Sequence, residues 1–207
     1  MVVELIQSTP RPIETVSEIA SICYDSTPKN PMKLVKHLYE SGHHSVFEHI
    51  YFTFKIEGIS RACSHQLVRH RMCSFTQRSQ RYCNELEGNI VIPQALADTI
   101  YSYDGYISAM QSIYGRYTDL IQAGIRKEDA RYILPNACCT GLYLSCNLRE
   151  LIHICNERLC SRAQWEIREL VKKMVDLVDP QLKFMLVPKC KSDRIICNSP
   201  CKSKGDL

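Results

Sequence analysis

The most chemically distinctive stretch of the chain is residues 69–82, which read RHRMCSFTQRSQRY. Four arginines, one histidine, two serines, one threonine and two glutamines fall within these fourteen residues, and glycine and proline are absent. A surface helix would carry an apolar stripe, which this segment lacks. Guanidinium and hydroxyl groups bind phosphates and the edges of planar bases. The segment therefore predicts a binding site for a phosphorylated, base-containing ligand.

Two spacings within and beside this segment suit such a ligand. Gln66 and Arg69 are three residues apart and share a helical face, so an amide and a guanidinium can together contact a base edge and a phosphate. In an extended chain, Arg69 and Arg71 point to one side and His70 to the other. The alternative is a solvated basic surface, which a helix C-terminus would favour.

The hydroxyl groups of the segment are weaker indicators, because turns use serine and threonine routinely. Ser79 lies between Arg78 and Arg81, where an anion would be held. No histidine at a fixed spacing marks Ser79 as an activated nucleophile.

A histidine-rich patch precedes the segment, with His43, His44 and Ser45 next to Gly42, and His49 shortly after. Zinc is one possible ligand, but the spacing matches no zinc signature. A loop that lines a ligand site is favoured. His49 falls in a predicted strand, where a hydrogen-bonded core histidine is the alternative.

A third group lies on a predicted helix that starts at residue 148. Arg149 and His153 are four residues apart on one face, and Arg158 lies about one turn further along. The alternative is a helix whose arginines extend their charged ends into solvent.

The chain has eight glycines and no GxG pair, so the dinucleotide fingerprint and the Walker A loop are both absent. A bound nucleotide would therefore be held by side chains. Cys138 and Cys139 have no adjacent base, which gives a covalent cysteine mechanism little support.

The hydrophobic patterns predict an α+β fold with an antiparallel sheet and flanking helices, because strands and helices do not alternate regularly. The predicted strands are the first residues, 46–57, 89–92 and 140–146. The predicted helices are 13–23, 31–42, 60–70, 94–123, 127–134, 148–160 and 164–177. Asn30 and Gly42 are the expected caps of the second helix, and Asn147 with Glu150 resembles a capping box.

The composition is that of a globular protein of 207 residues with a net charge of +4. No apolar run is long enough to span a membrane, and the start has no signal-peptide pattern, so a cytoplasmic location is expected. The twelve cysteines do not form a disulfide pattern. The cysteines expected in the core are Cys23, Cys63, Cys146, Cys155 and Cys160.

We expect one domain over residues 1–188 and a basic tail over 189–207 that contains Cys190, Cys197 and Cys201. A metal or redox role for this tail is the alternative to a poorly ordered terminus.

Residues 69–82 resemble the signature RHRxxSxNxxSxRY of the flavin-dependent thymidylate synthases, with Thr76 in the asparagine position. SGHHSVFEH at 41–49 is similar to the upstream GHxSxFEH segment of that family. Three further blocks match it, and the similarity covers most of residues 40–170. These blocks are EDARYILP at 128–135, NLRELIH at 147–153 and RLCSRAQWEI at 158–167.

The resemblance implies an enzyme of this family's fold that converts dUMP to dTMP. It implies FAD as cofactor, NADPH as reductant, 5,10-methylenetetrahydrofolate as carbon donor, and a homotetramer with active sites between subunits. The implied FAD site comprises His43, Ser45, Arg69, His70, Arg71, Gln77, Asn147, Arg149 and His153. The implied dUMP site comprises Gln66, Arg69, Gln77, Arg78, Ser79, Gln80, Arg81, Arg131 and Arg158.

Within that implied site, Arg158 is expected to act on the uracil ring, and Arg131 to reach a nucleotide in a neighbouring subunit. Gln77 stands where the family often has glutamate. No metal is expected.

The alternative from another class is a nucleic-acid-binding module, in which Phe75 and Tyr82 would stack bases between basic residues. The mild net charge and the confinement of the cluster to one loop count against it. A zinc-binding structural protein is a third alternative.

Overall fold

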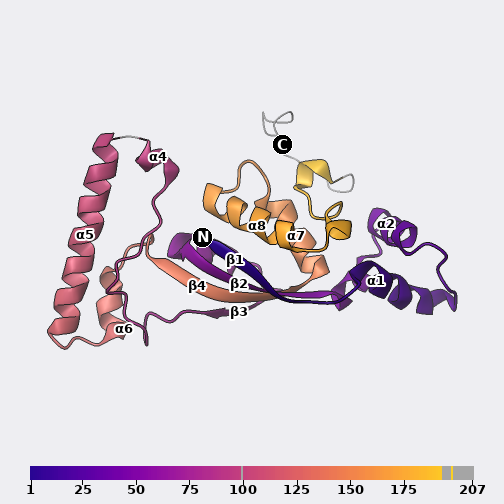
Figure 1. Cartoon of the computed structure of the whole chain (residues 1–207), viewed down its shortest axis with the longest axis horizontal. Coiled ribbons are helices and arrows are strands. Elements are labelled where there is room, and N and C mark those ends of the chain that lie inside the picture. The colour runs from indigo at the N-terminus through magenta and orange to yellow at the C-terminus, as the bar shows by residue number, and fades with distance from the viewer. Residues whose placement is uncertain (99, 193–196, 198–207) are drawn as a thin grey trace. The chain divides into compact units, whose positions relative to one another are not determined.

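The fold combines a four-stranded antiparallel sheet with helices, in a computed structural model that describes residues 1–98, 100–192 and 197 (Figure 1). The strand order is β1-β2-β4-β3. The strands are β1 (Val2–Ser8), β2 (Tyr51–Ser60), β3 (Ser74–Gln77) and β4 (Cys139–Asn147). The predicted α+β class with an antiparallel sheet is therefore confirmed.

Eight α-helices and five short 3-10 helices are found among the described residues. The α-helices are α1 (Pro12–Ser21), α2 (Pro31–Ser41), α3 (Arg61–Leu67), α4 (Gln94–Ala97), α5 (Ile100–Gln122), α6 (Lys127–Ala130), α7 (Leu148–Arg158) and α8 (Trp165–Leu177). The 3-10 helices are η1 (Ile22–Tyr24), η2 (His44–His49), η3 (Arg131–Ile133), η4 (Pro180–Leu182) and η5 (Lys189–Lys191). In the part of the chain that is described, no helix is long and apolar enough to cross a membrane.

Contacts between Cα atoms divide the chain into two units, and each is described by itself. Unit 1 contains Met1, 57–66 and 76–142, and unit 2 contains 2–56, 67–75 and 143–207. The division passes through β2, β3 and β4. One domain over 1–188 with a separate tail stays a prediction, and Cys201 of that tail lies outside the described residues.

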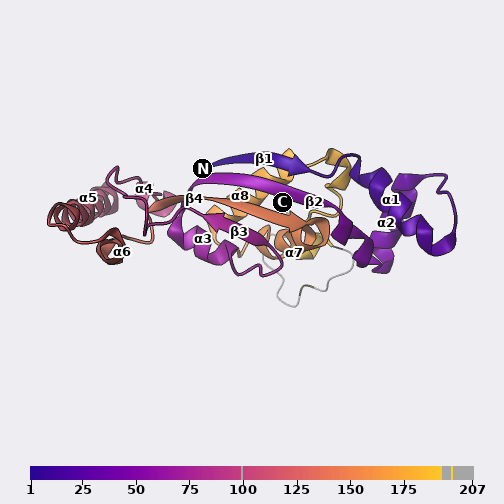
Figure 2. The same cartoon turned by 90° about the horizontal axis from the view of Figure 1, so that it is seen from below.

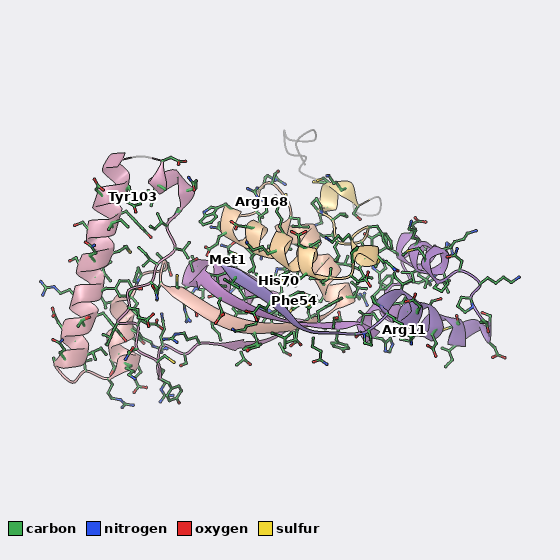
Figure 3. All side chains as sticks on the ribbon, viewed as in Figure 1. Met1, Arg11, Phe54, His70, Tyr103 and Arg168 are labelled. Carbon is green, nitrogen blue, oxygen red and sulfur yellow. The ribbon has the colours of Figure 1, made fainter. Side chains whose placement is uncertain are left out.

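In unit 2, α7 and α8 cover one face of the strands (Figures 1 and 2). The strand β2 alternates as expected, with Phe52, Phe54 and Ile56 buried on that face. Figure 3 shows Phe54 and His70 on the side of the strands that faces these helices. The helices bury Leu148, Leu151, Ile154, Ile167, Leu170, Val171 and Met174. This apolar layer supports the polar residues at the ends of α7.

Local capping rules fix two helices of unit 2. The side chain of Asn30 accepts a hydrogen bond from the Lys33 amide at the start of α2, and Gly42 ends the helix with φ 87°. A backbone position with positive φ favours glycine, because glycine has no Cβ. Asn147 caps α7 by accepting from the amide of Glu150 at 2.9 Å. Each of these three caps was predicted.

In unit 1, tyrosines of α5 hold the segment that follows the arginine-rich motif. Tyr114 and Tyr117 are buried; Tyr114 donates to the carbonyl of Asn89, and Tyr117 accepts from the amide of Glu85. Tyr106 donates to the carbonyl of Val91. The predicted strand at 89–92 is reduced to one antiparallel bridge between Ile90 and Cys138.

Several predicted boundaries were wrong. The strand expected from residue 46 starts at Tyr51, because 44–49 form η2. The helix expected to reach His70 ends at Leu67, and the helix expected over 94–123 is two helices, α4 and α5. Among the cysteines, Cys63, Cys146 and Cys155 are buried as predicted, whereas Cys23 is exposed and Cys160 is half-buried. Cys23 lies beyond the end of α1, where its apolar face stops.

Candidate functional site

The start of the arginine-rich motif alternates between solvent and core, although the backbone at residues 68–72 forms turns and not the extended chain that was expected. Arg69 and Arg71 are exposed, whereas His70 between them is 5% exposed. The α3 helix ends at Leu67, and two turns follow it, in which the amide of His70 donates to the carbonyl of Leu67 and the amide of Cys73 donates to the carbonyl of His70. Two guanidinium groups are therefore available to an anion from solvent, and the imidazole is held inside unit 2.

His70 contacts Arg158, the predicted site residue at the end of α7. Nε of Arg158 lies 3.0 Å from Nε2 of His70. Arginine nitrogens only donate, so Nε2 accepts this hydrogen bond and His70 is neutral. The pKa of His70 is lowered to about 4, mainly by burial and also by the charges of Arg158 and His153, against a smaller raising effect of Glu157.

Glu150 lies on the other side of the same imidazole. Its Oε1 is 3.6 Å from Nδ1 of His70, and it is 8% exposed. Burial raises the pKa of Glu150, against a lowering effect of His153. Because Nε2 accepts from Arg158, the ring proton of His70 is on Nδ1 and faces Glu150. The contact is longer than a good hydrogen bond and, with a neutral ring, it is no ion pair.

His70, Glu150 and His153 bring three potential ligand atoms within 4.8 Å of one another. The rings of His70 and His153 meet edge to face, with centroids 5.6 Å apart. This grouping has the composition of a metal site, but Nε2 of His70 is engaged by a guanidinium, whose charge would repel a cation. The histidine patch at 43–49, for which zinc was the alternative, does not take part in it.

That histidine patch divides into one structural residue and exposed neighbours. The ring of His44 stacks on Tyr39 with centroids 5.4 Å apart, and its Nε2 donates to the carbonyl of Tyr39 at 3.1 Å. His43 and Ser45 are exposed on either side. His49 is also exposed and lies in η2, so the predicted strand position and the alternative of a core histidine were both wrong.

The patch is tied to the start of α7 by an ion pair between Glu48 and Arg149. Both side chains are about half exposed, with 46% and 55% of their surface accessible. Residues 43–49 and the first turn of α7 therefore form one polar surface of unit 2. The N-terminus of α7 adds a partial positive charge to this surface.

The remaining arginines of the motif lie in unit 1 and are each paired with a carboxylate. Nε of Arg78 is 3.3 Å from Glu85, and Nε of Arg81 is 2.6 Å from Glu128. Glu128 also pairs with Arg126, and Arg131 donates to the Glu128 carbonyl at 3.1 Å. The hydrogen bond from Arg81 is the main cause that lowers the pKa of Glu128. Three guanidinium groups thus surround one acidic residue.

The polar residues between these arginines have structural partners in unit 1. Gln77 donates to Ser64 at 2.9 Å and to Thr140 at 3.3 Å, and Gln80 is buried with its amide 3.4 Å from Sγ of Cys138. Oγ of Ser79 accepts from the amide of Arg81 at 3.2 Å, as in a serine turn. Gln66 is half-buried on α3.

The predicted site residues therefore fall into two groups. The group in unit 2 comprises His43, Ser45, Arg69, His70, Arg71, Asn147, Arg149, His153 and Arg158. The group in unit 1 comprises Gln66, Gln77, Arg78, Ser79, Gln80, Arg81 and Arg131.

Comparison with known proteins decides what these groups belong to. Residues 4–182 match the family model described as thymidylate synthase complementing protein. A relative from Pyrococcus furiosus, named flavin-dependent thymidylate synthase, is 40% identical over 91% of this chain and 86% of its own. A relative of the same name from Geobacter sulfurreducens is 42% identical over 86% of this chain and 82% of its own. The chain belongs to the flavin-dependent thymidylate synthase family.

Solved structures share the fold of this chain. The structure of thymidylate synthase X from Helicobacter pylori with FAD and dUMP superposes with a TM-score of 0.76 at 24% identity, covering 90% of this chain and 97% of that one. A UMP/dUMP methylase from Streptomyces cacaoi bound with 5-Br dUMP gives a TM-score of 0.75 at 25% identity, with 84% and 88% covered. The first likeness concerns the fold alone.

In this flavin-dependent thymidylate synthase family member, carboxylates that the sequence did not indicate as site residues lie beside the predicted ones. Glu48, Glu128 and Glu150 each lie beside a predicted site residue. Glu150 was interpreted only as part of a capping box. Its position three residues before His153 on the same helical face was the signal that could have indicated a second role.

Proposed function

We propose that this chain catalyses the reductive methylation of dUMP to dTMP, with 5,10-methylenetetrahydrofolate as carbon donor, FAD as cofactor and NADPH as reductant. The observation that carries the proposal is family membership through relatives of this name at about 40% identity over most of both chains. The arrangement of arginines on a glycine-poor chain supports it, because without a glycine-rich loop side chains must supply most of the phosphate contacts.

The polar surface of unit 2 suits FAD by the chemistry of its donors. Arg69, Arg71 and Arg149 are exposed guanidinium groups, and His43 and Ser45 lie exposed on the segment joined to α7. These groups and the α7 N-terminus would hold the pyrophosphate. Asn147 would contribute its amide NH2, since its oxygen caps α7. Reduced by NADPH, the bound flavin would supply the hydride for dTMP formation.

The remaining residues predicted for FAD are His70, His153 and Gln77. His153 is exposed and edge-on to the buried His70. Gln77 bridges Ser64 and Thr140. We therefore propose that His153 contacts the cofactor directly, whereas His70 and Gln77 act by holding neighbouring groups in place.

The arginines of unit 1 suit the phosphate of dUMP. Arg81 and Arg126 pair with the carboxylate of Glu128, and an anion that enters here would exchange with that carboxylate. The other residues proposed for the nucleotide site are Arg78, Ser79 and Gln80 of the motif and Gln66 on α3. Gln80 is buried, so its contribution would be to the shape of the loop.

Arg158 is the proposed catalytic residue. A guanidinium near N3 and O4 of the uracil ring favours the deprotonated ring, because an opposite charge stabilises the anion. Reaction at the ring then needs no attacking thiolate. Ser79 would position dUMP, since its oxygen accepts from the Arg81 amide and is part of a turn.

The further partners follow from the same proposal. We propose a homotetramer with active sites between subunits, in which Arg131 reaches the nucleotide of a neighbouring subunit. We propose no nucleic-acid partner, and a cytoplasmic location.

One observation favours a second candidate substrate. The structural relative from Streptomyces cacaoi is described as a UMP/dUMP methylase. Parallel assays with dUMP and UMP decide between the two, and dUMP is expected to be the better substrate. A higher kcat/KM for UMP would favour the second candidate.

An absorbance spectrum tests the cofactor. The purified chain should be yellow, and NADPH should bleach the flavin band when oxygen is excluded. A colourless protein that binds oligonucleotides with a steep salt dependence would instead favour the nucleic-acid-binding alternative.

A further inference from the structure

We infer that Glu150 and His70 are positioning residues, which together fix the guanidinium of Arg158 in the orientation that its role on the uracil ring requires. The inference rests on the proposed function for the role of Arg158. It adds Glu150 to the functional residues of this chain and gives His70 a role other than direct contact with the cofactor.

The geometry carries the inference. His70 comes from the arginine-rich motif, whereas Glu150 and Arg158 come from the two ends of α7. The imidazole lies between them, with Nε2 at 3.0 Å from Nε of Arg158 and Nδ1 at 3.6 Å from Oε1 of Glu150. His70 and Glu150 are 5% and 8% exposed, while Arg158 is half-buried. Two buried side chains thus support one that reaches toward solvent.

The chemistry of the contact gives each residue a distinct task. Arg158 can only donate, so His70 supports it only with an unprotonated Nε2. The ring proton must then be on Nδ1. Ionised Glu150 can only accept, so its oxygen beside Nδ1 favours this tautomer over the other. The carboxylate therefore acts on Arg158 through the histidine.

On balance, the charges around His70 also favour its neutral form. Arg158 and His153 disfavour a protonated ring, and Glu157 favours it, while Glu150 faces Nδ1. Burial of the ring is the largest influence and favours the neutral form. A neutral ring is the state in which Nε2 can accept.

The consequence for Arg158 is orientational. A long arginine side chain samples many rotamers, and a bond to Nε fixes the plane of its guanidinium. Without that bond the charge would remain near the substrate, but the plane of its fork would be held less firmly. We therefore expect losses in kcat that exceed any change in the KM for dUMP.

Two substitutions of His70 separate the two ring nitrogens. In His70→Gln the amide oxygen can take the place of Nε2 and still accept from Arg158. In His70→Asn the shorter side chain reaches only the position of Nδ1, so the bond to Arg158 is lost. We expect His70→Gln to keep kcat within about threefold of wild type and His70→Asn to lose about tenfold, the scale of one hydrogen bond.

Glu150→Gln tests whether the carboxylate of Glu150 fixes the tautomer of His70. A glutamine amide can accept from Nδ1–H or donate to Nδ1, so it stabilises both tautomers, whereas the carboxylate stabilises one. We expect a fall in kcat of up to about tenfold, with unchanged flavin content. The matched control is Glu169→Gln, an exposed glutamate on α8 that pairs with Lys173, and it should behave as wild type.

A readout that does not depend on turnover accompanies these assays. Melting temperatures of His70→Asn, Arg158→Lys and the double variant form a cycle, and a direct bond predicts that the two single effects do not add. Flavin absorbance per subunit shows whether a variant has lost its cofactor site instead.

The outcomes distinguish this inference from the proposed function. If the wild type makes no dTMP, the proposed function fails. In that case the positioning contact is tested by the melting temperatures alone, and it is rejected if the shifts of the two single variants add up to the shift of the double variant. If the wild type is active and Arg158→Lys is inactive, wild-type kcat in both His70→Asn and Glu150→Gln would overturn the inference alone. Equal losses in His70→Gln and His70→Asn, with flavin and melting temperature intact, would overturn it as well.

Discussion

Arg81 and Glu128 form an ion pair with 2.6 Å between Nε and Oε2, although they are 47 residues apart in the chain. The pair places a carboxylate in the cluster of arginines that we propose for the dUMP phosphate. Glu128 would then compete with the phosphate for the same guanidinium groups.

This competition predicts that Glu128→Gln binds dUMP more tightly, with a Kd lower by about threefold, the scale of one exposed ion pair. Calorimetric titration with dUMP measures it. Asp119→Asn, which removes the partner of Arg116 on α5, is the control and should leave the Kd unchanged. Weaker binding in Glu128→Gln would show that the carboxylate orients Arg81 for the phosphate.

The turn role of Ser79 predicts a mild effect of its removal. Ser79→Ala loses the hydroxyl that accepts from the Arg81 amide, so the loop that presents Arg81 is less well ordered. We expect the KM for dUMP to rise several-fold while dTMP formation remains measurable. Steady-state kinetics checks this, and complete inactivity with intact dUMP binding would support a nucleophilic Ser79.

The buried neutral His70 predicts a pH dependence of stability. Its pKa is about 4 in the folded chain, against an ordinary 6.5. Below about pH 6.5 the unfolded state takes up a proton that the folded state does not. The stability that His70 contributes is therefore complete above that pH and is lost as the pH falls toward about 4, by about 3 kcal/mol.

Comparison with His70→Gln isolates this effect in the free energy of unfolding by denaturant. Glu150, whose pKa is raised, acts in the opposite direction in both proteins. The wild type should lose more stability than the variant between about pH 7 and about pH 4. His65→Gln, which changes an exposed histidine, is the control. Parallel pH curves for wild type and His70→Gln would contradict the assignment.

A site shared between subunits predicts complementation. Arg81→Ala and Arg131→Ala, each inactive alone, should recover part of the activity when mixed tetramers form, because some sites then receive both wild-type arginines. Activity across a series of mixing ratios measures this. Within one chain both arginines also lie beside Glu128, so a site built from a single subunit predicts no recovery. No recovery at any ratio would contradict the shared site.

Local rules predicted the parts of the fold that depend on neighbouring residues. Asn30, Gly42 and Asn147 cap their helices as expected. These features follow from backbone geometry within a few residues, which the sequence displays directly.

Features that depend on distant residues could not be predicted. His70 and Glu150 are 80 residues apart, and only the fold brings them together. His49 was expected in the strand that leads into Phe52 and Phe54, yet residues 44–49 form η2. The periodicity over 94–123 does not reveal that α4 ends at Ala97. Local propensity alone does not determine such features.

The most direct measurement is product formation by the purified chain with dUMP, 5,10-methylenetetrahydrofolate and NADPH under exclusion of oxygen, with dTMP quantified by chromatography. We predict that dTMP forms only when all three compounds and bound FAD are present, and that Arg158→Lys, with its flavin retained, forms at least about a hundredfold less. Absence of dTMP from a wild-type preparation that has bound FAD and dUMP would contradict the account.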